Sequence, residues 1–78
     1  MYADDLKWAA GRLRQLSGMV VVPPYVVTFV AGFLGDRNGV ATADVEAALR
    51  EMVPSLAIDA RRASAADRRA ARAMGRPS

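Results

Sequence analysis

The densest aliphatic run of the chain is VPPYVVTFVAGFLGDRNG, residues 22–39. Proline fits the first turn of a helix and disrupts its interior, so Pro23 and Pro24 predict that a helix begins here. The polar turn DRNG predicts where it ends, because Asn and Gly both tolerate positive φ angles. Gly35 is the expected left-handed cap. The sequence therefore predicts a helix over residues 24–34.

Helical spacing predicts which side of this helix faces the core. Its large apolar side chains recur at i, i+3, i+4 and i+7, and so share one face: Val26, Phe29, Val30 and Phe33. Other apolar residues spread around the helix, which predicts burial on most of its sides. A stripe of small residues, expected to let another backbone approach closely, consists of Thr28, Ala31, Gly32 and Gly35. We therefore expect this helix to lie at the centre of the fold.

A β-hairpin is the alternative interpretation of the same stretch. The valines before Pro23 are β-branched and Asn38-Gly39 is a hairpin signal, so residues 26–30 could form one arm. Short strands at 19–22 and 40–42 are left open. A membrane span is not expected, because the apolar run is shorter than the roughly twenty residues that a span requires.

Two amphipathic helices are predicted before and after this stretch. Residues 4–16 carry leucine and alanine at helical spacing, with Gly18 as the expected stop. Trp8 lies off their apolar face, where it either packs across a neighbouring helix or stays exposed as an anchor for a partner. Residues 42–52 form the second helix, with Thr42 as its N-cap.

The C-terminal part, residues 55–75, is a basic and alanine-rich helical segment. Ser55 is expected to cap it. Residues 64–67 resemble a capping box, which could divide the segment in two. The sequence as a whole predicts one all-α domain over residues 1–78. We expect a compact bundle of three to five short helices around the central apolar helix.

Composition narrows the range of functions. Of the 78 residues, 53% are hydrophobic, which is typical of a folded domain rather than a disordered chain. The chain has no Cys and no His, so it lacks thiolate chemistry, the usual general base and the commonest transition-metal ligand. We therefore expect a non-enzymatic protein without a cofactor, and a cytoplasmic setting is the default expectation.

The turn after the apolar helix resembles the calcium loop of the EF-hand family. With Gly39 at the sixth position of that loop, Asp36 and Asn38 fall at the third and fifth positions. The first and twelfth positions, which need carboxylates, are then Leu34 and Val45. Calcium binding is therefore not expected.

FVAGFLGDRN followed by ATADVEAAL resembles the first helix-turn-helix unit of phage terminase small subunits. That family has a shorter link, without Gly39 and Val40. The resemblance implies direct DNA binding through the helix at 42–52. That helix carries Asp44, Glu46 and Glu51, whereas a helix pressed against phosphates is expected to be basic. Direct DNA binding is therefore an alternative and not the first hypothesis.

Arginines dominate the C-terminal segment, although the formal net charge of the whole chain is only +3. On one continuous helix, Arg61, Arg68 and Arg72 share a stripe. Arg62, Arg69 and Arg76 form the adjacent stripe. Such a face is either a solubilising surface or a docking surface for polyanions, such as nucleic acid or an acidic protein. The predicted partner-binding residues are Arg61, Arg62, Arg68, Arg69 and Arg72.

The functional expectation combines small size, absent catalytic chemistry and one charged face. We expect an inhibitory or accessory binding protein that docks on a nucleic-acid-handling machine, as phage and mobile-element proteins do, anti-CRISPR inhibitors included. The partner is then a protein or a nucleoprotein complex. The alternatives are a direct DNA-binding helix-turn-helix protein and a structural subunit of a larger assembly. The sequence identifies neither the partner nor the oligomeric state.

Overall fold

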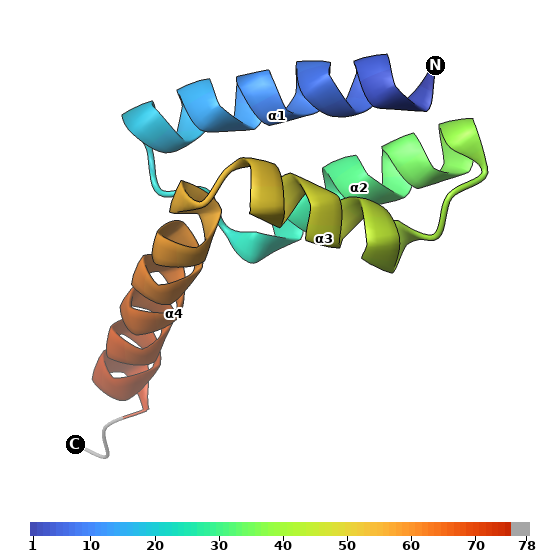
Figure 1. The fold of residues 1–78 in the computed structure, drawn as a ribbon. Helices are drawn as coiled ribbons and strands as arrows, with labels where there is room; N and C mark the ends of the chain where they lie inside the picture. The colour runs from blue at the N-terminus through green and yellow to red at the C-terminus, as the bar shows by residue number, and fades with distance from the viewer. Residues whose placement is uncertain (76–78) are drawn as a thin grey trace.

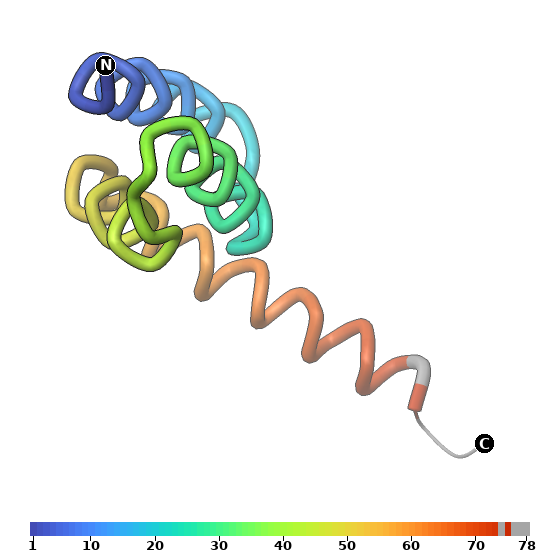
Figure 2. The backbone as a smooth tube through the Cα atoms, turned by 90° about the vertical axis from the view of Figure 1, so that its right-hand side faces the viewer, coloured from blue at the N-terminus to red at the C-terminus, as the bar shows by residue number. Residues whose placement is uncertain are grey.

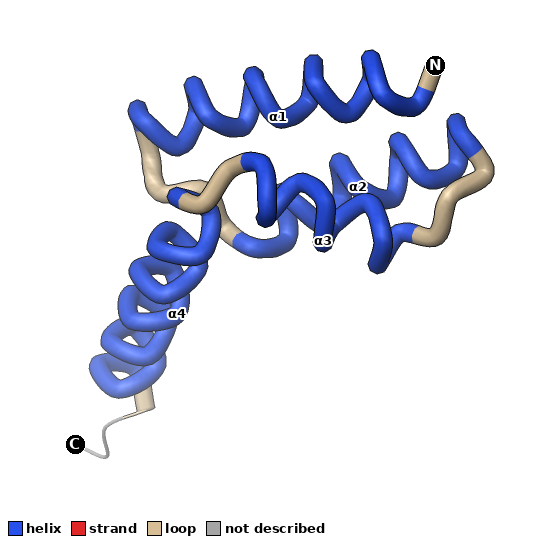
Figure 3. Tube along the Cα trace, viewed as in Figure 1, coloured by secondary structure: helices blue, strands red, loops and turns tan. Residues whose placement is uncertain are grey.

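The computed structural model describes residues 1–75, and within them it contains helices and no strand (Figures 1 and 3). The helices are α1 (Tyr2–Met19), α2 (Pro24–Asn38), α3 (Thr42–Met52) and α4 (Ser55–Met74). The predicted all-α class is confirmed. The β-hairpin alternative is wrong, because residues 26–30 lie inside α2 and neither 19–22 nor 40–42 contains a strand. No helix among the described residues is long and apolar enough to cross a membrane.

The helices form a three-helix bundle with a projecting fourth. Seen nearly end-on in Figure 2, α1, α2 and α3 occupy the corners of a triangle, and α4 runs away from it. The molecule measures 55 × 24 × 15 Å and its radius of gyration is 14.7 Å. A compact domain of this length would have a radius of gyration of about 11.5 Å. The difference reflects the projection of α4.

The core is small and aliphatic. Every helix contributes to it, as do the linkers before α2 and α4, and its buried members are Ala9, Ala10, Leu13, Val22, Val27, Ala31, Leu34, Val45, Leu49, Val53 and Leu56. None of these residues is aromatic. A chain of this size buries a modest fraction of its surface, so each of these contacts matters to stability.

The predicted buried face of α2 is wrong in its two phenylalanines, whereas Val26 and Val30 pack against the core as predicted, although they are only partly buried. Phe29 is 76% exposed and Phe33 is 61% exposed. The side that packs inward consists of Val27, Ala31, Leu34 and Gly35. Two members of the predicted small-residue stripe therefore line the contact, and bulky aromatic rings could not replace them there. As a result α2 is covered on one side only, and burial on most sides is not observed.

The end of α2 also differs from the prediction. The left-handed residue is Gly39, with φ 67° and ψ 34°, and not Gly35. Asn38 Nδ2 donates to the carbonyl of Leu34 at 2.9 Å, and so satisfies one of the last acceptors of the extended helix. Gly35 has a different role. A Cβ built on it would lie 2.5 Å from the carbonyl oxygen of Val40, so glycine lets the turn fold back against the helix.

Several other predicted boundaries need correction. α1 continues past Gly18, which allows a helical conformation as well as a stop. Thr42 and Ser55 are the first residues of α3 and α4, and the N-cap positions are Ala41 and Pro54. The break expected at 64–67 is absent, since α4 is one continuous helix of 20 residues. Alanine, the strongest helix former, supplies much of that helix and explains its continuity.

Candidate functional site

The base of α4 is anchored by a buried carboxylate. Asp59 is 3% exposed and accepts a hydrogen bond from the backbone N–H of Val22 at 3.2 Å. It also accepts one from the Ser17 hydroxyl, whose oxygen lies 2.9 Å from the Ser55 hydroxyl. Since a hydroxyl has one proton, Ser17 donates to Asp59 and accepts from Ser55. These bonds tie the first turns of α4 to the end of α1 and to the linker before α2.

Sequence reasoning did not single out Asp59 as a buried residue. The available signal was its helical position, three residues after the apolar Leu56 and four before the partly buried Ala63. With Asp59 turned inward, Asp67 is the one exposed acidic residue on the described part of α4. The outer surface of α4 is therefore more basic than the composition of the segment indicates.

All five predicted binding arginines lie on the exposed surface of α4. Because α4 is continuous, it holds Arg61, Arg62, Arg68, Arg69 and Arg72 on two adjacent stripes, as helical spacing predicts. The ion pairs among the described residues involve Arg37 and Arg50, so none of these five arginines has a carboxylate partner there. Arg76, the last member of the second stripe, lies outside the described residues. We call the five arginines the basic face.

The basic face contains one shallow hollow. Its volume is about 210 Å³, and it is lined by Ala65, Arg68, Arg69 and Arg72. Ala65 forms the floor because it is the only one of the four that is partly buried. Three guanidinium groups around a small floor can donate paired hydrogen bonds to a phosphate or carboxylate.

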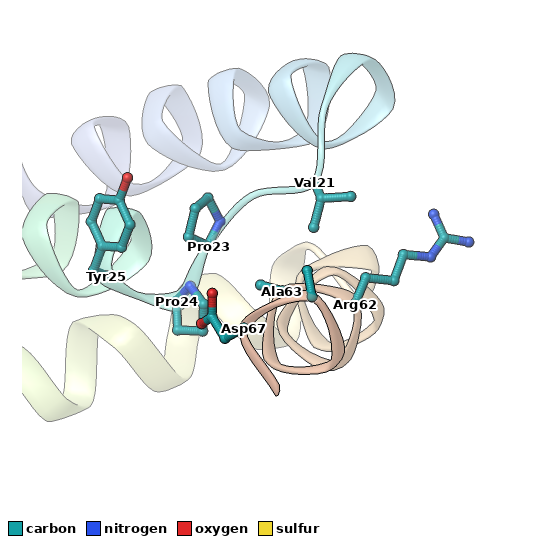
Figure 4. Close-up of a pocket in the computed structure, with 8 residues that line it drawn as sticks. Val21, Pro23, Pro24, Tyr25, Arg62, Ala63 and Asp67 are labelled. Carbon is teal, nitrogen blue, oxygen red and sulfur yellow. The ribbon is translucent and has the colours of Figure 1, made fainter. Parts of the chain in front are cut away.

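A second hollow lies between α4 and the linker to α2 (Figure 4). This groove has a volume of about 330 Å³ and is lined by Val21, Pro23, Pro24, Tyr25, Arg62, Ala63, Ala66 and Asp67. Arg62 extends outward from α4, whereas the prolines and Ala63 form an apolar wall. The groove can therefore receive an apolar side chain beside a positively charged group.

Two acidic groups of the bundle, Asp5 and Glu46, are engaged in ion pairs and hydrogen bonds. A hydrogen bond from Asn38 and the positive charge of Arg37 hold the pKa of Asp5 below its ordinary value of 3.8, against an opposing effect of burial. Hydrogen bonds from Arg50 and Thr28 likewise lower the pKa of Glu46 from its ordinary value of 4.5. Arg50 lies 2.9 Å from Glu46 and Arg37 lies 3.1 Å from Asp5. The bundle thus pairs Arg37 and Arg50 with carboxylates, in contrast to the arginines of the basic face.

Sequence reasoning missed the exposure of Tyr25, Phe29 and Phe33, and it left that of Trp8 open. Trp8 is 64% exposed and Tyr25 is 73% exposed, and Phe29 and Phe33 are exposed as well. Arg12 stacks over the Trp8 ring with its guanidinium carbon 5.7 Å from the centroid. A hollow of about 200 Å³ connects α1 to α2 here, lined by Trp8, Ala9, Arg12, Leu13, Leu16, Val26 and Val30. Trp8 therefore faces the hollow next to α2 and is exposed to solvent, as the alternative of an exposed anchor requires.

Comparison with protein-family models, with curated proteins and with solved structures gives no match for this chain. The function is therefore argued from the chemistry of its surfaces.

Proposed function

We propose that this protein is a non-enzymatic binding protein that docks on a nucleic-acid-handling complex through the basic face of α4. The observation that carries the proposal is the projection of α4 from the bundle, with five exposed arginines that have no carboxylate partner among the described residues. In this proposal α1, α2 and α3 are a scaffold that holds α4. The protein acts in the cytoplasm as an accessory or inhibitory component, of the kind that phages and mobile elements encode.

The chemistry of arginine supports this function. Each guanidinium presents a planar fork of donors that matches carboxylate or phosphate with two parallel hydrogen bonds. A helix of 20 residues is about 30 Å long, so its arginines can reach a partner surface beyond the edge of the bundle. No aromatic residue lies on α4, so base stacking of the single-strand type does not contribute. The expected contact is therefore electrostatic and geometric.

Direct DNA binding through α3 has weaker support. The arginine near the end of α3, Arg50, is paired with Glu46 one turn earlier. Asp44 and Glu51 are exposed on the same helix. A helix with this charge pattern would repel the phosphates that border a DNA groove. Should the protein bind DNA directly, α4 is the element expected to do so.

The test reverses three charges that lie away from the core, in the triple variant Arg61→Glu, Arg68→Glu, Arg72→Glu. We expect it to retain its helicity, because all three side chains are exposed, and to lose capture of the partner complex. The matched control replaces the same three residues with Lys. It keeps the charge and removes the fork, so we expect intermediate binding.

Titration with labelled duplex DNA at several salt concentrations separates the two kinds of partner. If the partner is a protein, naked DNA binds weakly and without sequence preference. If the partner is DNA, the affinity falls with salt at a log–log slope of about −0.9 per phosphate neutralised. Unchanged partner capture and unchanged DNA binding in the Glu variant would reduce the basic face to a solubilising surface.

A further inference from the structure

The outer side of α2 is an unpartnered aromatic stripe. Tyr25, Phe29 and Phe33 follow one another at intervals of four residues, close to one turn of a helix, and each is more than half exposed. Val26 and Val30 flank this stripe and line the hollow that leads to Trp8 on α1. We call the stripe together with the residues of this hollow the aromatic surface.

The area of the aromatic surface is close to what one partner contributes to a stable interface. An aromatic side chain buries roughly 150–250 Å², and with about two-thirds of each exposed, four of them leave roughly 400–700 Å². Exposed Leu16 and partly exposed Val26 and Val30 extend it. A standard interface buries about 800 Å² per partner. The surface is therefore large enough for a specific interface between macromolecules.

The order of residues along the stripe is symmetric about its centre. Phe29 has an aromatic residue four positions before it and another four positions after it. When two copies of α2 lie antiparallel with Phe29 on a two-fold axis, Phe29 meets Phe29 of the second copy. Tyr25 then meets Phe33 of the second copy. A two-fold interface requires this kind of self-complementarity.

The charges at the two ends of the stripe match the same arrangement. Asp36 is exposed on the side of the stripe, seven residues beyond Phe29, or about 10 Å along the helix. In the antiparallel pair it lies opposite position 22 of the second copy, just before α2 begins at Pro24. The first turn of α2 has no acidic residue and no side-chain cap, and the helix dipole leaves partial positive charge at this end. Arg62 and Asp67 both line the groove beside Tyr25 at the same end, so the groove adds charges of both signs there.

We propose that the aromatic surface binds a second copy of this chain, with the two α2 helices antiparallel about Phe29. A parallel pair is disfavoured because it would bring the two Asp36 carboxylates together at the negative ends of both helices. The inference does not rest on the proposed function of α4. It adds that each particle carries two basic faces, which raises the avidity for a partner with two sites.

Sedimentation equilibrium over a range of concentrations tests the association. We expect twice the chain mass for the unmodified protein, and a dissociation constant weakened by about 30-fold or more for Phe29→Asp. Because Phe29 is exposed in the single chain, this variant is expected to stay folded, as circular dichroism would verify. A measured mass equal to that of a single chain at every concentration would overturn the proposal. This holds even if the aromatic surface is found to bind lipid vesicles instead.

Cysteine crosslinking tests the geometry, since the chain has no Cys of its own. We expect Phe29→Cys to form a covalent dimer on mild oxidation, because the two positions meet on the axis. Tyr25→Cys alone should not, since its two copies are about 12 Å apart along the helices. A mixture of Tyr25→Cys and Phe33→Cys should form the mixed dimer. Ala47→Cys, exposed on α3, is the control for random collision.

Crosslinking of Phe29→Cys no better than that of Ala47→Cys would overturn the antiparallel interface. Efficient self-crosslinking of Tyr25→Cys would replace it with a parallel one and so contradict the proposal. The triple Glu variant of α4 should retain the dimer mass. Loss of partner capture while the dimer stays intact therefore tests the proposed function of α4 alone. Loss of the dimer while DNA or partner binding stays intact tests the proposed interface on α2 alone.

Discussion

The two sides of α2 differ in the size of their side chains, whereas those of a typical amphipathic helix differ in polarity. The inner side packs with Val27, Ala31 and Gly35, which are small or branched, whereas the outer side presents Phe29 and Phe33. Both sides are apolar, so the usual contrast between apolar core and polar surface cannot assign them. Close approach of another backbone requires small residues, and large rings need space that this core does not have. Side-chain size, and not hydrophobicity, decides which side is buried.

The neighbouring residues Leu34, which is buried, and Phe33, which is exposed, give the sharpest test of this difference. The larger loss of stability is expected at Leu34. Leu34→Ala leaves a cavity in a core that is too small to refill it, and we expect a loss of about 3 kcal/mol in the free energy of unfolding. Urea denaturation followed by circular dichroism measures it. A loss below about 1 kcal/mol would mean that Leu34 is not part of the core.

Gly35→Ala tests the close contact directly. The added Cβ would lie 2.5 Å from the Val40 carbonyl oxygen, so the turn must shift, and we expect a loss of about 2 kcal/mol in unfolding free energy. Gly32→Ala is the matched control on the same helix, because its nearest neighbours are Thr42 side-chain atoms at 4.0 Å. We expect the control to gain up to about 1 kcal/mol from reduced freedom of the unfolded chain. Equal effects of the two substitutions would contradict the packing described here.

Acid should weaken two contacts, the one that Asp5 makes between α1 and the end of α2 and the one that Glu46 makes between α3 and α2. The lowered pKa values of Asp5 and Glu46 mean that both groups stay ionised to lower pH in the folded chain than in the unfolded one. Their contribution to stability is complete above the ordinary values of 3.8 and 4.5, and is lost as the pH falls through the lowered folded values. Thermal melts should show a falling Tm over that range, and a smaller fall in Asp5→Asn.

The smallest effect on stability is expected on the outer side of α2. Phe33→Ala should change the unfolding free energy by about 0.5 kcal/mol when the protein is dilute, because the ring is exposed in the single chain. At high concentration the same substitution should lower Tm more, since the dimer stabilises only the folded chain. A loss of about 3 kcal/mol at every concentration would restore the sequence-based assignment of Phe33 to the core.

Local chemistry explains which parts of the fold were predictable. Proline sets the start of α2, and the bounds of α3 follow from its apolar spacing and the proline after it. The end of α2 was assigned to the wrong glycine because Gly35 and Gly39 have equal intrinsic freedom. The turn that folds back against Gly35 decides between them, and that contact is not local.

The candidate site shows the same division. The exposure and stripes of the basic face followed from helical spacing and charge, which are properties of one helix. The burial of Asp59 did not, because its donors Ser17 and Val22 come from a distant part of the chain. The exposed aromatic stripe was also missed, since periodicity identifies an apolar face without stating whether this chain or a second one covers it.

The projection of α4 also determines how a protease would meet this molecule. The residues around Arg61 and Arg62 are held to the bundle by Leu56 and Asp59, whereas positions 68–73 are all exposed. Local opening of a helix is easiest where its residues make the fewest tertiary contacts. Trypsin, which cleaves after arginine, is therefore expected to cut first at Arg68, Arg69 and Arg72. A cut after Arg68 removes Arg69 and Arg72 from the basic face in one step and leaves the three-helix scaffold folded.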